Sequence, residues 1–189
     1  MGRPVFVSQI GRPKAGIGCG IAATMMLLNH HVQRGARPKY IELAKCLWTD
    51  VDPRVKGYTL ATGYGAYLDD IVSFLKRQGI AHWFTCPRTS ATPKTLQRML
   101  TTLAVAPCIL GMYRKGDGRW GPYGHWIVAY RYEGRREVIR YLDPQYRGSD
   151  TRHDSTLAVD DLRQCWDGSA VGIYKKYRRL PVSNLCSAA

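Results

Sequence analysis

Residues 16–29 read Gly-Ile-Gly-Cys-Gly-Ile-Ala-Ala-Thr-Met-Met-Leu-Leu-Asn, and they constrain the fold more than any other stretch of the chain. From Ile21 to Leu28 nearly every residue is apolar, on all sides of a helical wheel. Such a pattern is typical of a helix that is buried all round at the centre of a domain. A basic turn at Arg34, followed by Gly35, predicts that this helix runs from about residue 20 to residue 34.

Cys19 stands at the start of this helix. Unpaired backbone N–H groups and the positive end of the helix dipole favour a thiolate there, and the thiolate is the nucleophilic form of cysteine. Gly16, Gly18 and Gly20 are expected to leave room for a substrate backbone beside the sulfur. The alternative is that Cys19, one of six cysteines, is only a small buried hydrophobe.

A catalytic cysteine needs a base, and a predicted hairpin supplies one. Residues 124–132 and 136–143 have the pattern of two strands, joined by a short connection with Gly134 at its centre. Centring the hairpin on Gly134 pairs Arg131 with Glu137, and opposite charges across a ladder support that register.

The same register places His125 opposite Asp143, with Cβ atoms about 5 Å apart. His125 would then act as general base toward Cys19, while Asp143 fixes its tautomer and stabilises the imidazolium. The alternative is a His–Asp pair that only satisfies itself at the end of a sheet. The other histidines compete poorly as the base. His30 and His31 lie late on the helix that Cys19 opens, about 15 Å or more from it, and His82 and His153 are expected to be structural or solvated.

The remaining periodicity indicates helices before strands. Helices are expected at 38–47, 66–78, 93–103 and 159–166, strands at 3–8, 80–86, 107–113 and 170–177, and loops at 48–65 and 115–124. This order predicts an α+β fold with a mostly antiparallel sheet. Residues 1–189 are expected to form a single domain, with a helical half at about 16–105 and a sheet half at about 106–180.

Composition narrows the class of protein. The net charge of +14 favours acidic partners, but the Lys and Arg residues are spread out and no nucleic-acid-binding motif accompanies them, so a solvated surface is the simpler interpretation. The six cysteines contain no CxxC pair, which argues against a zinc site and against a compact disulfide framework. We therefore expect no metal or cofactor, a monomer, and a reducing cytosol; no membrane span or signal peptide is evident.

The chain resembles the papain-like cysteine peptidases, especially bacteriocin-leader peptidase domains and avirulence-type effector proteases of plant pathogens. The resemblance is carried by Val7-Ser8-Gln9, by Gly18-Cys19-Gly20 leading a buried helix, by Gly124-His125-Trp126 and by Leu142-Asp143-Pro144. It implies the papain-like fold and a Cys19–His125–Asp143 triad. It also implies that Gln9 completes an oxyanion hole with the Cys19 backbone N–H, although the loop from Gln9 to Cys19 is longer than is usual in these relatives.

We therefore expect a thiol protease that cleaves protein or peptide substrates, acidic ones included, through a thioester acyl-enzyme. The resemblance also suggests a bacterial effector or toxin, cytoplasmic in its fold or exported by a specialised secretion system. The same residues could instead serve deamidation, acyl transfer or cell-wall peptide hydrolysis, and a non-catalytic basic binding module is the alternative from another class. The C-terminal Cys186-Ser-Ala-Ala has only the outline of a prenylation signal.

Overall fold

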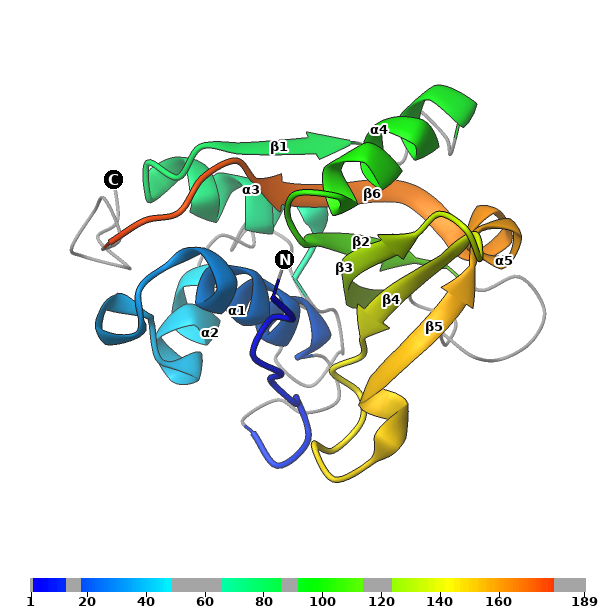
Figure 1. Cartoon of the computed structure of the whole chain (residues 1–189). Helices are drawn as coiled ribbons and strands as arrows, with labels where there is room; N and C mark the ends of the chain where they lie inside the picture. The colour runs from blue at the N-terminus through cyan, green and yellow to red at the C-terminus, as the bar shows by residue number, and fades with distance from the viewer. Residues whose placement is uncertain (1, 13–17, 49–65, 86–91, 114–123, 179–189) are drawn as a thin grey trace, which may run out of the picture.

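The computed structural model describes residues 2–12, 18–48, 66–85, 92–113 and 124–178 (Figure 1). The expected loops at 48–65 and 115–124 and the prenylation motif fall almost entirely outside these ranges. The described helices are α1 (Cys19–His31), α2 (Tyr40–Trp48), α3 (Leu68–Arg77), α4 (Pro93–Leu103) and α5 (Val159–Cys165), with short 3-10 turns η1 (Arg34–Ala36) and η3 (Thr151–His153).

A six-stranded sheet runs through the molecule in the order β1-β6-β2-β3-β4-β5, and every neighbouring pair is antiparallel. Its strands are β1 (His82–Thr85), β2 (Cys108–Met112), β3 (His125–Glu133), β4 (Val138–Leu142), β5 (Asp154–Ala158) and β6 (Trp166–Ile173). The predicted α+β class with an antiparallel sheet is confirmed.

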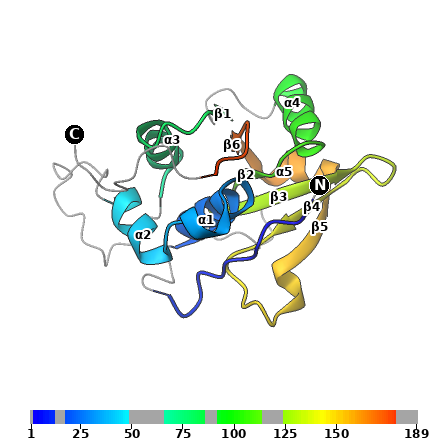
Figure 2. The ribbon, with the colours of Figure 1, turned by 60° about the vertical axis from the view of Figure 1, so that its left-hand side comes forward.

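Two helical layers cover the two faces of the sheet (Figures 1 and 2). Helices α1, α2 and α3 share one hydrophobic core with Ile109, Val128 and Val171 of the central strands. Helices α4 and α5 share a second core with the alternate residues of these strands, such as Leu110 and Ile127, on the other face of the sheet. Side chains alternate between the faces of a strand, so the central strands are buried on both sides.

Helix α1 lies at the centre of the first layer, as its all-round apolar pattern predicts. Ile21, Met26 and Leu28 have no exposed surface. The helix ends at His31, three residues before the predicted end, because Val32 turns extended and forms a parallel bridge with Tyr177. That bridge is a contact with the distant C-terminal segment, which local capping signals do not report.

The predicted hairpin register is wrong, although both strands exist. Arg131 faces Arg140 instead of Glu137, and Glu137 lies in the turn with φ of +49°. Closer to the site the register shifts, so that Ala129 pairs with Tyr141. Tyr130 is the extra residue of this β-bulge, because one residue separates Ala129 from Arg131 while Tyr141 directly follows Arg140.

Two further strand predictions need correction, and one strand was not predicted. Residues 3–8 form no strand. The edge strand β5 was missed because Leu157 is its only fully buried side chain among polar neighbours. Strand β6 begins at Trp166 and ends at Ile173, earlier than the predicted 170–177. Its first residues pair irregularly with β2, so their side chains do not follow the alternating pattern by which a strand is predicted.

Candidate active site

The N-terminal turn of α1 presents Cys19 beside the first residues of β3. The Cys19 side chain is partly exposed, and it hydrogen-bonds with the side chain of His125. Burial raises the pKa of the Cys19 thiol, but the hydrogen bond and positive charge of His125, together with the backbone N–H groups of Trp126 and Gly20, outweigh that effect. The result is a thiol pKa below its ordinary value, which favours the thiolate.

His125 is the first residue of β3, and its ring joins two partners. Its Nε2 atom lies 2.7 Å from Oδ1 of Asp143, which follows β4, and both side chains are buried. This leaves Nδ1 as the ring nitrogen available to Cys19. Two consecutive hydrogen bonds therefore connect the Cys19 sulfur, the His125 imidazole and the Asp143 carboxylate.

The electrostatics of the pair favour a charged imidazole. Burial by itself lowers the pKa of His125, but the hydrogen bonds to Asp143 and Cys19 and the negative charges of both partners raise it to about 10. A lowered thiol pKa and a raised imidazole pKa together describe a thiolate–imidazolium pair near neutral pH.

Asp143 is held by its own backbone and by the loop that follows it. Only 1% of Asp143 is exposed. Its N–H donates to the carbonyl of His153 at 2.9 Å, and its Oδ1 accepts a second hydrogen bond from the N–H of Gln145 at 3.0 Å. The first bond fixes the Asp143 backbone, and the Gln145 N–H helps to keep the carboxylate oriented toward His125.

Gln9 lies directly beside this loop. Its backbone N–H donates to the carbonyl of Pro144 at 2.9 Å, and only 7% of the residue is exposed. Ser8 strengthens the attachment, since its hydroxyl donates to the carbonyl of Tyr146 at 2.7 Å and accepts from the N–H of Ile10 at 3.0 Å. The N-terminal segment is thus docked next to Asp143.

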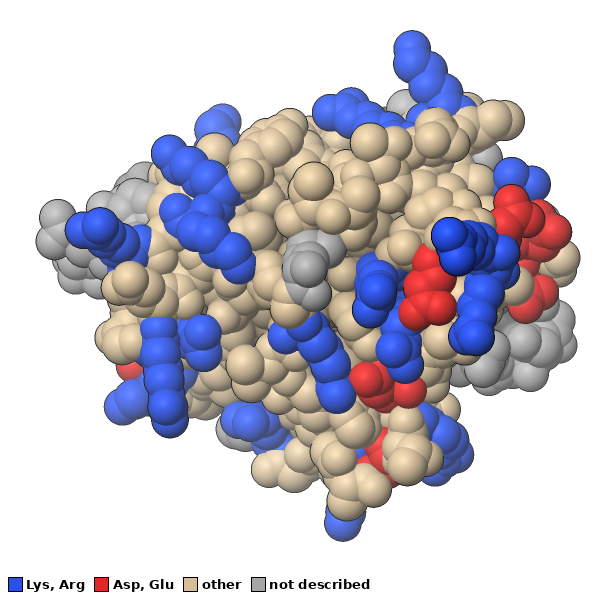
Figure 3. Space-filling view, in the orientation of Figure 1, with Lys and Arg blue, Asp and Glu red and all other residues tan. Residues whose placement is uncertain are grey.

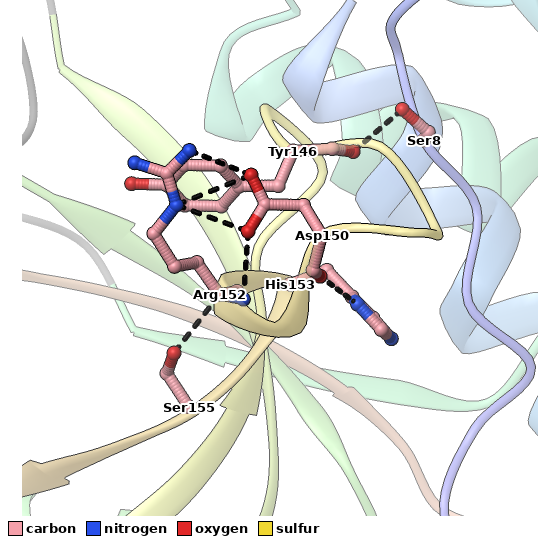
Figure 4. A network of polar contacts seen from close by, with 6 residues as sticks. All are labelled: Ser8, Tyr146, Asp150, Arg152, His153 and Ser155. Carbon is pink, nitrogen blue, oxygen red and sulfur yellow. Dashed lines mark hydrogen bonds and ion pairs between the residues drawn. The ribbon is translucent and has the colours of Figure 1, made fainter.

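A network of polar contacts stiffens the same loop (Figure 4). Asp150 and Arg152 form an ion pair at 2.6 Å, and the Arg152 guanidinium lies 4.6 Å from the centre of the Tyr146 ring. His153 donates from Nδ1 to the carbonyl of Asp150, and Ser155 donates to the carbonyl of Arg152 at 2.9 Å. His153, expected to be structural or solvated, thus takes part in the loop that positions Asp143.

Residue 20 is a glycine because of packing within the protein, and not to leave room for a substrate as predicted. A Cβ atom there would lie 2.9 Å from the Cβ of Ala66 and 3.1 Å from Cδ1 of Trp126. The space above Gly20 is therefore filled by the protein itself and not left for a substrate. The indole N–H of Trp126 donates to the carbonyl of Ala66 at 2.7 Å, which fixes this packing.

Tyr40 and Arg12, on the Gly18 side of the thiol, were not predicted from the sequence to belong to the site. The Tyr40 hydroxyl lies 3.5 Å from the carbonyl of Gly18, and the Arg12 guanidinium lies 4.9 Å from the centre of the Tyr40 ring. Burial, with an added contribution from the nearby Cys19, raises the pKa of Tyr40 to about 12 although Arg12 lowers it. A lone tyrosine early in a helix offers no sequence signal for this contact.

The other cysteines differ from one another. Cys108 and Cys165 are free thiols, and burial raises the pKa of the Cys108 thiol above its usual range. Cys46 is disulfide-bonded, which a simple assignment to a reducing compartment did not anticipate. Among the described residues, no group of three or more His, Cys, Asp or Glu side chains is arranged to hold a metal ion.

The fold defined by these elements is the papain-like cysteine peptidase fold. It is similar to the solved peptidase domain of Streptococcus ComA, a bi-functional ABC transporter involved in a quorum-sensing pathway, with 16% identity, a TM-score of 0.60, and coverage of 93% of this chain and 100% of that one. It is also similar to a double-glycine motif protease from an AMS/PCAT transporter, solved with its leader peptide, with 11% identity, a TM-score of 0.57, and 90% of each chain covered. No family model and no curated protein matches the chain by sequence.

Proposed function

We propose that the protein is a cysteine peptidase in which Cys19 is the nucleophile, His125 the acid–base group, Asp143 its orienting partner and Gln9 an oxyanion-hole residue. The observation that carries the proposal is the double contact of the buried His125 ring, with Cys19 on one side and Asp143 on the other. The papain-like fold supports it.

The proposed reaction starts from the thiolate–imidazolium pair. The Cys19 sulfur attacks the carbonyl carbon of the scissile bond, and the developing oxyanion accepts hydrogen bonds from the Cys19 backbone N–H and the Gln9 side chain. His125 then donates its proton to the leaving amine as the C–N bond breaks, which leaves the acyl group on sulfur as a thioester. Water next gives a proton to His125 and attacks the thioester, and the C–S bond breaks to restore the thiolate.

Peptides are the proposed substrates. One of the structural neighbours is a double-glycine motif protease bound to a leader peptide. Peptides that contain a Gly-Gly pair are therefore the first candidates for this chain.

In the described ranges no helix is long and apolar enough to cross a membrane.

The test combines thiol reactivity with peptide cleavage. Iodoacetamide labelling between pH 4 and pH 9, followed by peptide mapping, is expected to modify Cys19 fastest at acidic pH, and His125→Ala is expected to slow it. Cleavage of double-glycine peptides is expected in the native protein and is lost in Cys19→Ala. Cys108 and Cys165 serve as internal references, since both are free thiols in the same molecule. A Cys19 that reacts no faster than these two would contradict the proposal.

Other outcomes identify the alternative reactions. Release of ammonia without chain cleavage would indicate deamidation, and transfer of the acyl group to an added amine would indicate acyl transfer. On the face seen in Figure 3, Lys and Arg are scattered over the surface, so that face does not favour a basic binding module. A role as a secreted effector or toxin stays a prediction, and detection of the protein inside a target cell would test it.

A further inference from the structure

Strand β6 carries an irregular pairing next to the site. Leu110 of β2 pairs with Ala170, and Met112 pairs with Trp166. Between these pairs β2 contributes one residue, Gly111, whereas β6 contributes residues 167–169. Gly168, in the middle of these, has φ of +93°. Bulges of this kind redirect side chains and are frequent beside active sites.

The bulge folds the carboxylate of Asp167 onto Gly111. A Cβ atom at Gly111 would lie 2.8 Å from both Oδ1 and Oδ2 of Asp167. The N–H of Ser169 donates to Oδ1 at 2.6 Å and holds the carboxylate there. Any side chain at residue 111 would displace this carboxylate, so Asp167 can occupy this place only because residue 111 is a glycine.

The pairing of β2 with β3 puts this carboxylate on the face of the sheet against which α1, the helix that begins at Cys19, packs. Gly111 pairs with Trp126, and Met112 pairs with His125. Ile109 and Val128, at the alternate positions of the same strands, pack in the core shared with α1, so Gly111 and Trp126 face that side as well. Trp126 in turn approaches Gly20 beside Cys19. Two strand spacings separate β6 from β3, about 10 Å, which an extended peptide spans in two or three residues.

Asp167 has no cationic partner in the described part of the chain. Its hydrogen bonds come from the backbone and from Ser169, and the side chain remains partly exposed. Burial raises the pKa of its carboxyl group against those hydrogen bonds. This is notable in a protein with 28 Lys and Arg residues and 14 Asp and Glu residues. Carboxylates that are partly withdrawn from water are usually paired, so Asp167 is a candidate to bind a cationic group.

We propose that Asp167 is a specificity-determining residue that binds a cationic group of the substrate, an ammonium or guanidinium, located two or three residues from the scissile bond. The proposal rests on the peptidase function proposed above. It names the substrate class more closely: a peptide with a basic group near the cleavage position.

Binding to the Cys19→Ala protein tests the proposal without turnover. Fluorescently labelled double-glycine peptides are prepared in matched pairs, with Lys or Gln at each of the three positions on either side of the Gly-Gly pair. At one or two of these positions the Lys peptide is expected to bind at least about tenfold more tightly than its Gln partner, as a charge-assisted hydrogen bond would give. Peptides with free and acetylated N-termini separate a side-chain ammonium from a terminal one.

Asp167→Asn is the decisive variant, because the amide oxygen can still accept from the N–H of Ser169 and preserve the bulge. It is expected to abolish the preference for Lys while leaving the affinity for Gln peptides and the thermal unfolding temperature unchanged. Asp160→Asn, which removes an exposed carboxylate on α5, is the matched control and keeps the preference.

Equal binding of the paired peptides, or no binding of any of them, would overturn the proposal. A preference for Lys that survives in Asp167→Asn would do the same. If the preference is present and depends on Asp167, but the native protein cleaves nothing and Cys19 is unreactive, the cation site stands and the peptidase function fails. Peptide binding thus tests the cation site, and cleavage with thiol reactivity tests the peptidase function.

Discussion

Asp143 reaches His125 diagonally across the ladder between β3 and β4, with Oδ1 of the carboxylate 2.7 Å from Nε2 of the imidazole. The pair of Ala129 with Tyr141 places Asp143 on the same side of the ladder as His125, displaced by two residues. The bulge at Tyr130 is what makes this possible. Without that extra residue the register of Glu133 with Val138 would continue, and Asp143 would point to the opposite side.

Removing the Asp143 carboxylate is expected to weaken the ion pair of the site. Because Asp143 helps to raise the pKa of His125 to about 10, Asp143→Ala should lower that pKa and so reduce the thiolate fraction of Cys19 at neutral pH. The rate of iodoacetamide labelling at pH 6 is expected to fall roughly tenfold, equivalent to about 1.4 kcal/mol. Asp160→Ala, at an exposed position on α5, serves as the control. An unchanged pH profile in Asp143→Ala would contradict this role.

Gln9 is expected to act on turnover and not on thiol reactivity. If its side chain stabilises the oxyanion, Gln9→Ala should lower kcat by about a hundredfold, the usual cost of losing one such donor. Labelling of Cys19 by iodoacetamide should remain at the native rate, because alkylation forms no oxyanion. Gln33→Ala, at an exposed glutamine after α1, is the comparison. Loss of labelling together with turnover would instead indicate a structural role.

Gly20→Ala is expected to destabilise the protein although alanine favours helices. Helix propensity alone would stabilise the variant by about 1 kcal/mol. The new Cβ, however, would lie 2.9 Å from Ala66 Cβ and 3.2 Å from the Ala66 carbonyl oxygen, so backbone must move. A net loss of about 1–3 kcal/mol is expected from chemical denaturation. Gly35→Ala, where nothing lies within 4 Å, should show no such loss, and equal effects of the two variants would refute the packing argument.

His31 is expected to make the fold sensitive to acid. Burial and the neighbouring charges of His30 and Lys176 lower the pKa of His31 to about 4, although the hydrogen bond with the Lys175 carbonyl acts in the opposite direction. The unfolded chain takes up this proton near pH 6.5 and the folded protein only near pH 4. Stability from this residue is therefore complete above pH 6.5 and declines as the pH falls toward 4, by on the order of 2 kcal/mol. Urea denaturation of His31→Gln at pH 7.5 and pH 4.5 should show a smaller decline, and an identical decline would exclude this origin.

The His125–Asp143 contact was predicted from a register that is wrong. The charges of Arg131 and Glu137 suggested a cross-strand pair, but in the structure Arg131 faces Arg140. The predicted and observed registers near the site differ by two residues, and a slip of two keeps every side chain on its own face. The bulge could not be predicted because Tyr130 owes its position to tertiary contacts: it is buried against the α1 core, and its hydroxyl donates to Asp154 at 2.7 Å.

The sequence by itself determined the parts that depend on local periodicity and local chemistry. The apolar run after Cys19 required a buried helix with the thiol at its positive end, and Thr92 with Pro93 marked the start of α4. Only the tertiary structure decided which distant groups meet. The docking of Gln9 on Pro144 and the packing of Trp126 against Gly20 depend on contacts between segments far apart in the chain. Such contacts are selected by the packing of whole layers, and no short stretch of sequence carries that information.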